Sequence, residues 1–230
     1  MVACAFAPTA SAHLQAGTLA ARAARPAAAH HLIVYVRAGA RVAVHARPFG
    51  AVIERLGART EFGSRRALGV VRARSDRWLG VSVAGLGDHR LGWIDARAGG
   101  LRFARTRLEI NVDLSARRLV VRRGTEILRK MIVGVGRSGS PTPTGRYSIT
   151  DKLPGPDFSA YYGCCIIALS ATQPYLPAGW SEGNRVAIHG TPSPSDYGHA
   201  VSAGCLHARN TDLRYLMRVA ALGTPVVIQR

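Results

Sequence analysis

Short apolar runs that alternate with polar residues and are separated by glycine recur from residue 32 onward, and this period-two pattern most constrains the fold. No helical pattern lies between the first of these runs. Strands at such close spacing predict a small all-β barrel over residues 32–101. Its strands are expected at 33–36, 42–44, 67–71, 78–81 and 91–94.

The second half of the chain continues the same pattern after residues 102–107, which we predict to be a linker. One helix is expected near the end. Asn210 or Thr211 would cap it, Leu213 and Leu216 would share its buried face, and a Gly-Thr-Pro stop at 223–225 would end it. Residues 107–230 are therefore predicted to form a mainly β domain with one late α-helix, with strands at 108–114, 119–121, 127–135, 147–149, 166–169, 186–188 and 226–228.

The first 31 residues are rich in alanine and carry the small-x-small triplet Ala10-Ser11-Ala12. Such a triplet is typical of a signal-peptidase site, although the basic segment that usually precedes the apolar run is missing. We expect either a shortened export leader, in which Cys4 is a candidate for lipidation, or a disordered tail. No apolar run reaches the roughly 18 residues of a membrane-spanning helix, so no membrane span is expected.

The chain is strongly basic, with 31 Lys and Arg against 13 Asp and Glu, a net charge of +18. Its 47% hydrophobic content excludes a wholly disordered chain. Fifteen basic residues face five acidic ones in residues 1–103, and sixteen face eight in 104–230. Because the charge is spread without a recognition motif or interleaved aromatic residues, no nucleic-acid partner is expected. Attraction to anionic cell-wall polymers explains the charge equally well.

Of the four cysteines, Cys205 stands in the most unusual context. Cys164 and Cys165 are neighbours, and we expect them to be strand-packing thiols without a disulfide. Cys205 follows Gly204 and lies shortly after His189 in sequence, across a loop rich in Pro, Ser and Gly. That loop is long enough to bring an imidazole beside the thiol, and the imidazole would take the thiol proton.

The residues around this pair suggest supporting roles. Gly204 permits a sharp turn that aims the Gly204 and Cys205 amides into the site, where they would hold an oxyanion. The Gly190 carbonyl or the Ser202 hydroxyl would orient the far nitrogen of His189, and the sequence leaves both open. A zinc site from Cys205, His207 and His189 has suitable donors but only three of them, so no metal and no cofactor is expected.

Taken together, these segments resemble the L,D-transpeptidase (YkuD-type) catalytic domain, whose signature is His-Gly followed after a loop by Ser-x-Gly-Cys. The resemblance covers about 120 residues, and the first domain resembles bacterial SH3-like domains through Arg47-Pro48, Trp78-Leu79 and Gly92-Trp93-Ile94. Further stretches of the catalytic domain fall in family order: Val112–Ser115 with Arg118-Leu119, Pro141–Tyr147, Tyr162-Gly163 with Leu169–Ala171, and Gly223–Val226.

The resemblance implies an extracytoplasmic enzyme with a mainly β fold that acts on peptidoglycan stem peptides. Cys205 would attack the third residue of a tetrapeptide stem, expel D-Ala and pass the acyl group to a second stem as a 3→3 cross-link. His189 would be the general base and acid, and Ser202 would shape the cysteine loop. Tyr162, Thr191 and His207 would contact substrate, although the family often has Arg or Asn where this chain has His207. Two alternatives stay open: an L,D-carboxypeptidase that uses water, and a basic wall-binding or nucleic-acid-binding protein without chemistry.

Overall fold

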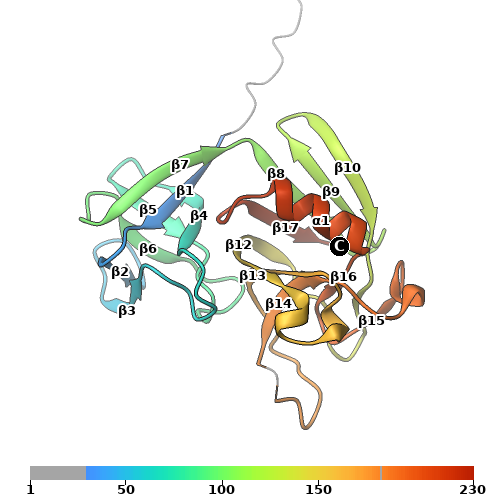
Figure 1. Ribbon diagram of the computed structural model, residues 1–230. Helices are drawn as coiled ribbons and strands as arrows, with labels where there is room; N and C mark the ends of the chain where they lie inside the picture. The colour runs from blue at the N-terminus through green and yellow to red at the C-terminus, as the bar shows by residue number, and fades with distance from the viewer. Residues whose placement is uncertain (1–29, 182) are drawn as a thin grey trace, which may run out of the picture.

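The computed structural model describes residues 30–181 and 183–230. The expected export leader or tail, including Cys4 and the Ala10-Ser11-Ala12 triplet, falls on residues 1–29, outside the described residues. Two large antiparallel-rich sheets lie side by side, and the single described α-helix covers part of the second sheet (Figure 1). The mainly β fold with one late helix is therefore confirmed.

A seven-stranded sheet forms the N-terminal part of the molecule, in the order β3-β2-β6-β5-β4-β1-β7. Its core gathers inward-facing aliphatic residues such as Val34, Val44, Val81 and Ile94, all with exposed fractions of 0%. The strands are β1 (His31–Val36), β2 (Arg41–His45), β3 (Val52–Gly57), β4 (Ala67–Ala73), β5 (Trp78–Val81), β6 (Gly92–Asp95) and β7 (Leu101–Thr106).

Two of these strands differ from the sequence-based expectation. The predicted linker at 102–107 is wrong, because Leu101–Thr106 is strand β7 and pairs with β1 over six residues. β3 was not expected at all. Both are the terminal strands of the sheet, where basic residues or exposed apolar ones such as Val52 and Ile53 replace the buried alternation. An edge strand held by backbone bonds on one side needs no regular hydrophobic pattern, so the sequence gives no signal for it.

An eight-stranded sheet forms the C-terminal part, in the order β10-β9-β8-β17-β12-β13-β14-β16. The burial of β8 alternates along the strand, with Leu108, Ile110 and Val112 facing the core. The strands are β8 (Leu108–Asp113), β9 (Arg118–Arg123), β10 (Glu126–Ile132), β12 (Gly145–Pro154), β13 (Cys165–Thr172), β14 (Arg185–His189), β16 (Leu206–His207) and β17 (Pro225–Gln229).

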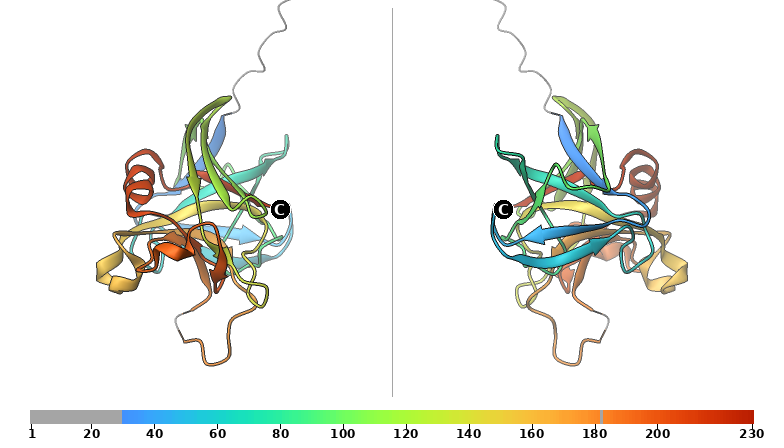
Figure 2. Two further views of the ribbon diagram at one scale, coloured as in Figure 1. Left: turned by 90° about the vertical axis from the view of Figure 1, so that its right-hand side faces the viewer. Right: turned by 90° about the vertical axis from the view of Figure 1, so that its left-hand side faces the viewer.

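Smaller elements connect these strands. The predicted strand 127–135 ends early at Ile132, because the chain leaves β9 there and Val135–Gly136 (β11) pairs in parallel with Ala200–Ser202 (β15). Three short 3-10 helices lie in the connections: η1 (Gly155–Asp157), η2 (Ala160–Tyr162) and η3 (Pro194–Asp196). η3 lies beside the end of β10, where the Gly198 N–H donates to the Val133 carbonyl oxygen, whereas the yellow η1–η2 segment lies at the same edge of the molecule as the red helix α1 (Figure 2).

Helix α1 (Asn210–Val219) packs on β13 through the fully buried Leu213 and Leu216, as expected. Its N-cap differs from the prediction. The cap residue is Arg209, which makes no side-chain cap bond, while the side-chain oxygen of Asn210 accepts a hydrogen bond from the backbone N–H of Cys164, 2.9 Å away. The capping side chain is thus used to hold the η2–β13 segment against the helix.

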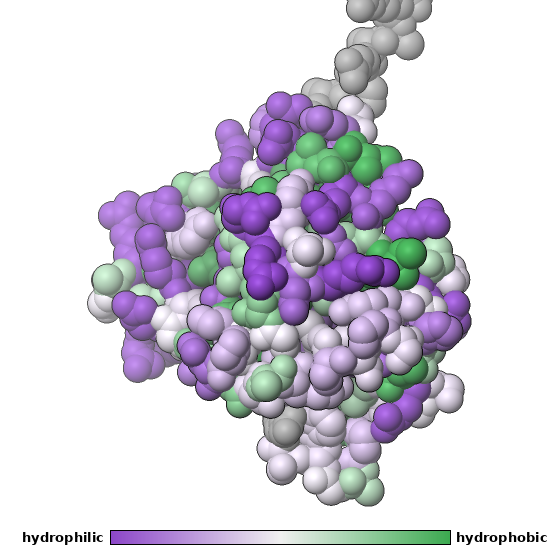
Figure 3. Space-filling view, turned by 45° about the vertical axis from the view of Figure 1, so that its right-hand side comes forward, coloured by the Kyte–Doolittle hydropathy of each residue, from purple (hydrophilic) through white to green (hydrophobic). Residues whose placement is uncertain are grey.

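Among the described residues, no helix is long and apolar enough to cross a bilayer. On the face drawn in Figure 3, strongly hydrophilic residues cover much of the upper half and alternate with small apolar patches. The exposed large apolar residues, among them Phe49, Phe103 and Ile132, come from different elements and are not gathered in one segment.

Candidate active site

A cavity of about 270 Å³ lies along β14 and contains the side chains that the sequence singled out. Cys205, His189 and His207 all line it, and so do Ser202 and Tyr162. The structure therefore brings these five residues into one site. Thr191 and Gly190 do not line the cavity; Gly190 bonds to His189 and Tyr162, and Thr191 bonds to Asp196.

The alternation of β14 explains how His189 reaches the cavity. Val186 and Ile188 turn into the hydrophobic core, whereas Arg185, Ala187 and His189 occupy the other face of the strand. The His189 ring is nearly buried, and its Nδ1 lies 2.6 Å from the Gly190 carbonyl oxygen. Nδ1–H donates to that carbonyl, which leaves Nε2 as the acceptor nitrogen. Of the two orienting groups considered from sequence, Gly190 is the one in place.

Gly190 also allows a close backbone approach. A Cβ at this position would lie 2.8 Å from the Cα of Gly163 and 2.8 Å from the Tyr162 carbonyl oxygen, to which the Gly190 N–H donates. No side chain fits there. The contact brings the Tyr162 ring edge-on to His189, with 4.9 Å between ring centroids. Tyr162 thus forms the wall of the cavity beside His189.

The cysteine loop is fixed by hydrogen bonds within it. The Ser202 hydroxyl donates to the Cys205 carbonyl (2.6 Å) and accepts from the Gly204 N–H (3.0 Å). The Gly204 N–H is bonded to Ser202, so it stabilises the shape of the loop and does not point into the cavity as a free oxyanion donor. Gly204 has φ of +122°, and a Cβ there would collide with the side-chain amide of Gln173.

Gln173 is a site residue that the sequence reasoning missed. Its buried amide nitrogen donates to the carbonyl oxygens of Pro141 (2.9 Å) and Ala203 (3.1 Å), which ties the cysteine loop to the loop after β11. A glutamine that follows a strand carries no motif, so only the coordinates reveal it.

Asp196 is a second residue that was missed. Its Oδ2 accepts hydrogen bonds from His207 Nδ1 (2.7 Å) and from the Thr191 hydroxyl (2.6 Å). His207 is nearly buried and pairs in register with His189 across the parallel strands β16 and β14, so the two rings lie 4.8 Å apart. Thr191 therefore acts on His207 through Asp196. The only sequence signal for Asp196 was its place in the Pro/Ser-rich loop.

Burial governs the titration of the site. It lowers the pKa of His189 to about 4, and the neighbouring His207 adds to this effect, while the bond to Gly190 opposes it. Burial also lowers the pKa of His207, although the Asp196 carboxylate opposes that shift. Partial burial favours a higher pKa for Asp196, but hydrogen bonds from Thr191 and His207 bring it below its ordinary value.

The thiol of Cys205 is protonated at neutral pH, because burial raises its pKa to about 11. It donates a hydrogen bond to the backbone oxygen of Arg185 at 3.9 Å. The resting site thus holds a neutral thiol and a neutral imidazole rather than a thiolate–imidazolium pair. This arrangement suits a base that removes the proton as the sulfur attacks.

Cys164 and Cys165 form a disulfide, which corrects the prediction of two separate thiols. The prediction rested on the difficulty of bridging two cysteines that are neighbours in sequence. Cys164 lies in the turn before β13, after Gly163 with its φ of +64°, so the two side chains are not held on opposite faces. Cys165 joins the core and Cys164 packs beside it. Within residues 30–181 and 183–230, no three His, Cys, Asp or Glu side chains gather as metal ligands.

Sequence comparison places the catalytic part of the chain among known proteins. Residues 107–228 match the family model of the L,D-transpeptidase catalytic domain, YkuD. The putative L,D-transpeptidase YkuD of Bacillus subtilis is 30% identical over 123 residues, which cover 53% of this chain and 65% of that protein. The chain thus spans less than two thirds of that relative's length.

Solved structures give a similar list. The Bdellovibrio bacteriovorus protein Bd1075 is 27% identical, with a TM-score of 0.41 over 54% of this chain and 48% of its own. An L,D-transpeptidase from Mycobacterium smegmatis is 17% identical, with a TM-score of 0.44 over 86% of this chain and 99% of its own. Because the family model matches more than half of the residues, the chain belongs to the L,D-transpeptidase (YkuD) catalytic domain family.

Proposed function

We propose that the protein is a cysteine-dependent L,D-transpeptidase that forms 3→3 cross-links between peptidoglycan stem peptides. One observation carries the proposal: Cys205 and His189 line the same cavity, and the bond from His189 Nδ1 to the Gly190 carbonyl leaves Nε2 ready to accept a proton. A nucleophile and an oriented base in one pocket are the minimal equipment for acyl transfer.

In the first half-reaction, the Cys205 sulfur leaves the Arg185 carbonyl and attacks the carbonyl carbon of the third stem residue. His189 Nε2 takes the thiol proton as the C–S bond forms. The Cys205 backbone N–H stabilises the oxyanion, since the Gly204 N–H is bonded to Ser202. The tetrahedral intermediate then collapses, the C–N bond breaks, and D-Ala leaves with the proton from His189.

In the second half-reaction, the side-chain amine of an acceptor stem attacks the thioester. Neutral His189 removes a proton from the amine and returns it to the departing Cys205 sulfur, which restores the resting thiol. His207, held by Asp196, lies beside His189 and contacts the acceptor. Water in place of the amine would make the enzyme an L,D-carboxypeptidase.

Two measurements test this function. Intact mass after exposure to a carbapenem is expected to show one adduct on the wild type and none on Cys205→Ala. Incubation with tetrapeptide muropeptides is expected to give cross-linked dimers together with free D-Ala. Loss of D-Ala without dimers would establish the carboxypeptidase. The absence of both the carbapenem adduct and any muropeptide product would contradict an enzymatic function.

We also propose an extracytoplasmic location, which the peptidoglycan substrate implies, and an SH3-like barrel over residues 32–101, which the resemblance of its motifs implies. A third proposal is attraction of the basic surface to anionic wall polymers. A net charge of +18 supports the last of these. Co-sedimentation of the Cys205→Ala protein with isolated cell walls is expected to fall as salt is raised, because salt screens such attraction. Sedimentation that is absent at low salt would contradict it.

A further inference from the structure

One residue of the active-site cavity comes from the N-terminal sheet. Phe62, in the loop between β3 and β4, lines the same cavity as Cys205 and His189. This loop lies outside residues 107–228, the part of the chain that matches the family. The cavity is therefore completed by a part of the molecule that the family resemblance does not describe.

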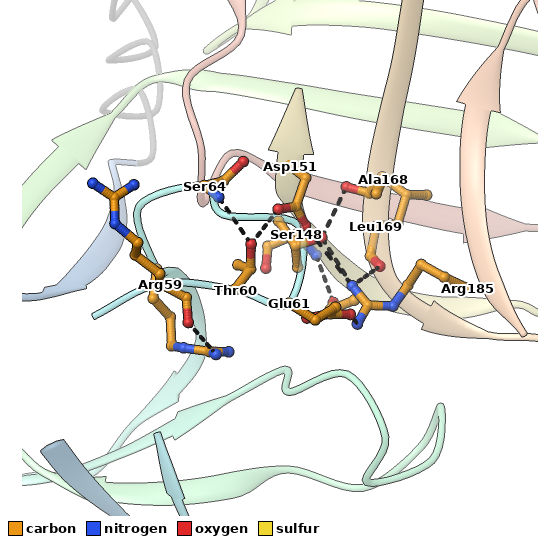
Figure 4. A network of polar contacts seen from close by, with 12 residues as sticks. Arg59, Thr60, Glu61, Ser64, Ser148, Asp151, Ala168, Leu169 and Arg185 are labelled. Carbon is orange, nitrogen blue, oxygen red and sulfur yellow. Dashed lines mark hydrogen bonds and ion pairs between the residues drawn. The ribbon is translucent and has the colours of Figure 1, made fainter. Parts of the chain in front are cut away.

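Polar contacts hold this loop against the eight-stranded sheet (Figure 4). The Thr60 hydroxyl donates to the carboxylate of Asp151, which is fully buried on β12. Glu61 forms an ion pair with the Arg185 guanidinium, which also donates to the Thr150 hydroxyl (3.1 Å). A buried carboxylate bonded across the two sheets makes displacement of the loop costly. Phe62 is thus presented to the cavity from a fixed support.

Aromatic surface at this end of the cavity remains open. The Phe62 ring lies edge-on to Phe158, with 6.1 Å between centroids, and the Arg185 guanidinium lies 5.8 Å from its centre. Phe62 is still 37% exposed and Phe158 is 50% exposed. Two exposed aromatic rings on the rim of a pocket are suited to cover the apolar atoms of a bound peptide.

Arg185 links Phe62 to the nucleophile. Its guanidinium lies 5.8 Å from the centre of the Phe62 ring, and its backbone oxygen accepts the hydrogen bond from the Cys205 thiol. A peptide whose carbonyl carbon reaches the Cys205 sulfur therefore has the Phe62 ring about one arginine side chain away. We propose that the 59–64 loop is one wall of the donor-peptide site and that Phe62 contacts the residues of the stem next to the attacked carbonyl. This inference rests on the proposed function.

Binding to an inactive protein tests the inference apart from turnover. In the Cys205→Ala background, calorimetry with a stem tetrapeptide is expected to show Kd raised about tenfold by Phe62→Ala, which removes the aromatic contact. Phe62→Tyr is expected to retain the affinity. In the active protein, Phe62→Ala is expected to raise KM for the tetrapeptide and leave the rate of Cys205 alkylation by iodoacetamide unchanged, because that small reagent has no peptide part for Phe62 to bind.

Phe103→Ala is the matched control, since Phe103 lies on β7 of the same N-terminal sheet, is 44% exposed and does not line the cavity. Its expected Kd is that of the parent. Equal affinity of Phe62→Ala and its parent would overturn the inference while leaving the proposed function intact. Binding without turnover by the wild type would overturn the proposed function alone, and absence of binding by every variant would overturn both.

Discussion

The imidazole rings of His189 and His207 lie 4.8 Å apart, because the two residues are register partners on the parallel strands β14 and β16. Two protonated rings at that separation repel each other, and burial disfavours both charges. The His189 imidazole is therefore neutral in mildly acidic solution.

Acylation of Cys205 is expected to persist into acid. The pKa of His189 is about 4, so the imidazole is neutral and able to accept a proton at every pH above that value. The rate of carbapenem acylation is expected to fall only as the pH drops through about 4, not near the ordinary histidine value. Stopped-flow or mass-resolved rates from pH 3.5 to 8 measure this. A midpoint above pH 6 would show that the base is not the buried His189.

His207→Asn is expected to move that acid midpoint to higher pH. The positive charge of His207 helps to lower the pKa of His189, and an amide carries no charge. The same pH–rate profile, recorded on the variant, is the measurement. His89→Asn is the control, because His89 does not line the catalytic cavity. An unshifted midpoint in His207→Asn would show that burial alone sets the titration.

Gly204→Ala is expected to damage both the site and the fold. The φ of +122° is strained for any residue with a Cβ, at a cost of about 1–3 kcal/mol, and the new methyl group would displace Gln173 from the cysteine loop. A lower melting temperature and a slower acylation of Cys205 are expected. Gly139→Ala, where an added Cβ meets nothing within 4 Å, is expected to leave both values unchanged. Wild-type behaviour of Gly204→Ala would contradict the described loop.

Thr60→Val is expected to destabilise the molecule by about 1–3 kcal/mol, because it leaves the buried Asp151 carboxylate without the Thr60 hydroxyl. The substitution keeps the shape of the side chain, so packing is preserved. The midpoint of urea unfolding measures the effect. Thr125→Val, at an exposed turn, is the matched control and is expected to be neutral. Equal midpoints would show that the joint between the two sheets contributes little to stability.

In the eight-stranded sheet, β8, β9 and β17 were predictable because their burial alternates along the strand. Residues such as Ile110 and Val112 alternate inward, and the helix face of Leu213 and Leu216 repeats at helical spacing. β3 and β7 escaped prediction because terminal strands are stabilised by backbone pairing rather than by inward side chains. Pattern reasoning detects burial, and these strands bury little.

Some site residues were likewise predictable and others were not. His189 and Cys205 lie next to glycines in recognisable motifs, because the close backbone contacts at Gly190 and Gly204 exclude a side chain. Asp196 and Gln173 act through contacts with residues distant in sequence, and no local spacing encodes those contacts. Phe62 was the hardest cavity residue to predict, because its place in the cavity depends on how the N-terminal sheet packs against the eight-stranded sheet.

Strand β14 carries Arg185 at its first position and His189 at its last. Through Arg185 and Glu61 it is coupled to the N-terminal sheet, and through His189 it lines the cavity that holds Cys205. A graft of residues 107–230 onto a foreign partner would therefore carry Cys205 and His189 but leave out the side of the cavity that Phe62 forms. A chimeric protein should therefore take the 59–64 loop and β14 from the same parent, because Glu61 and Arg185 pair across them.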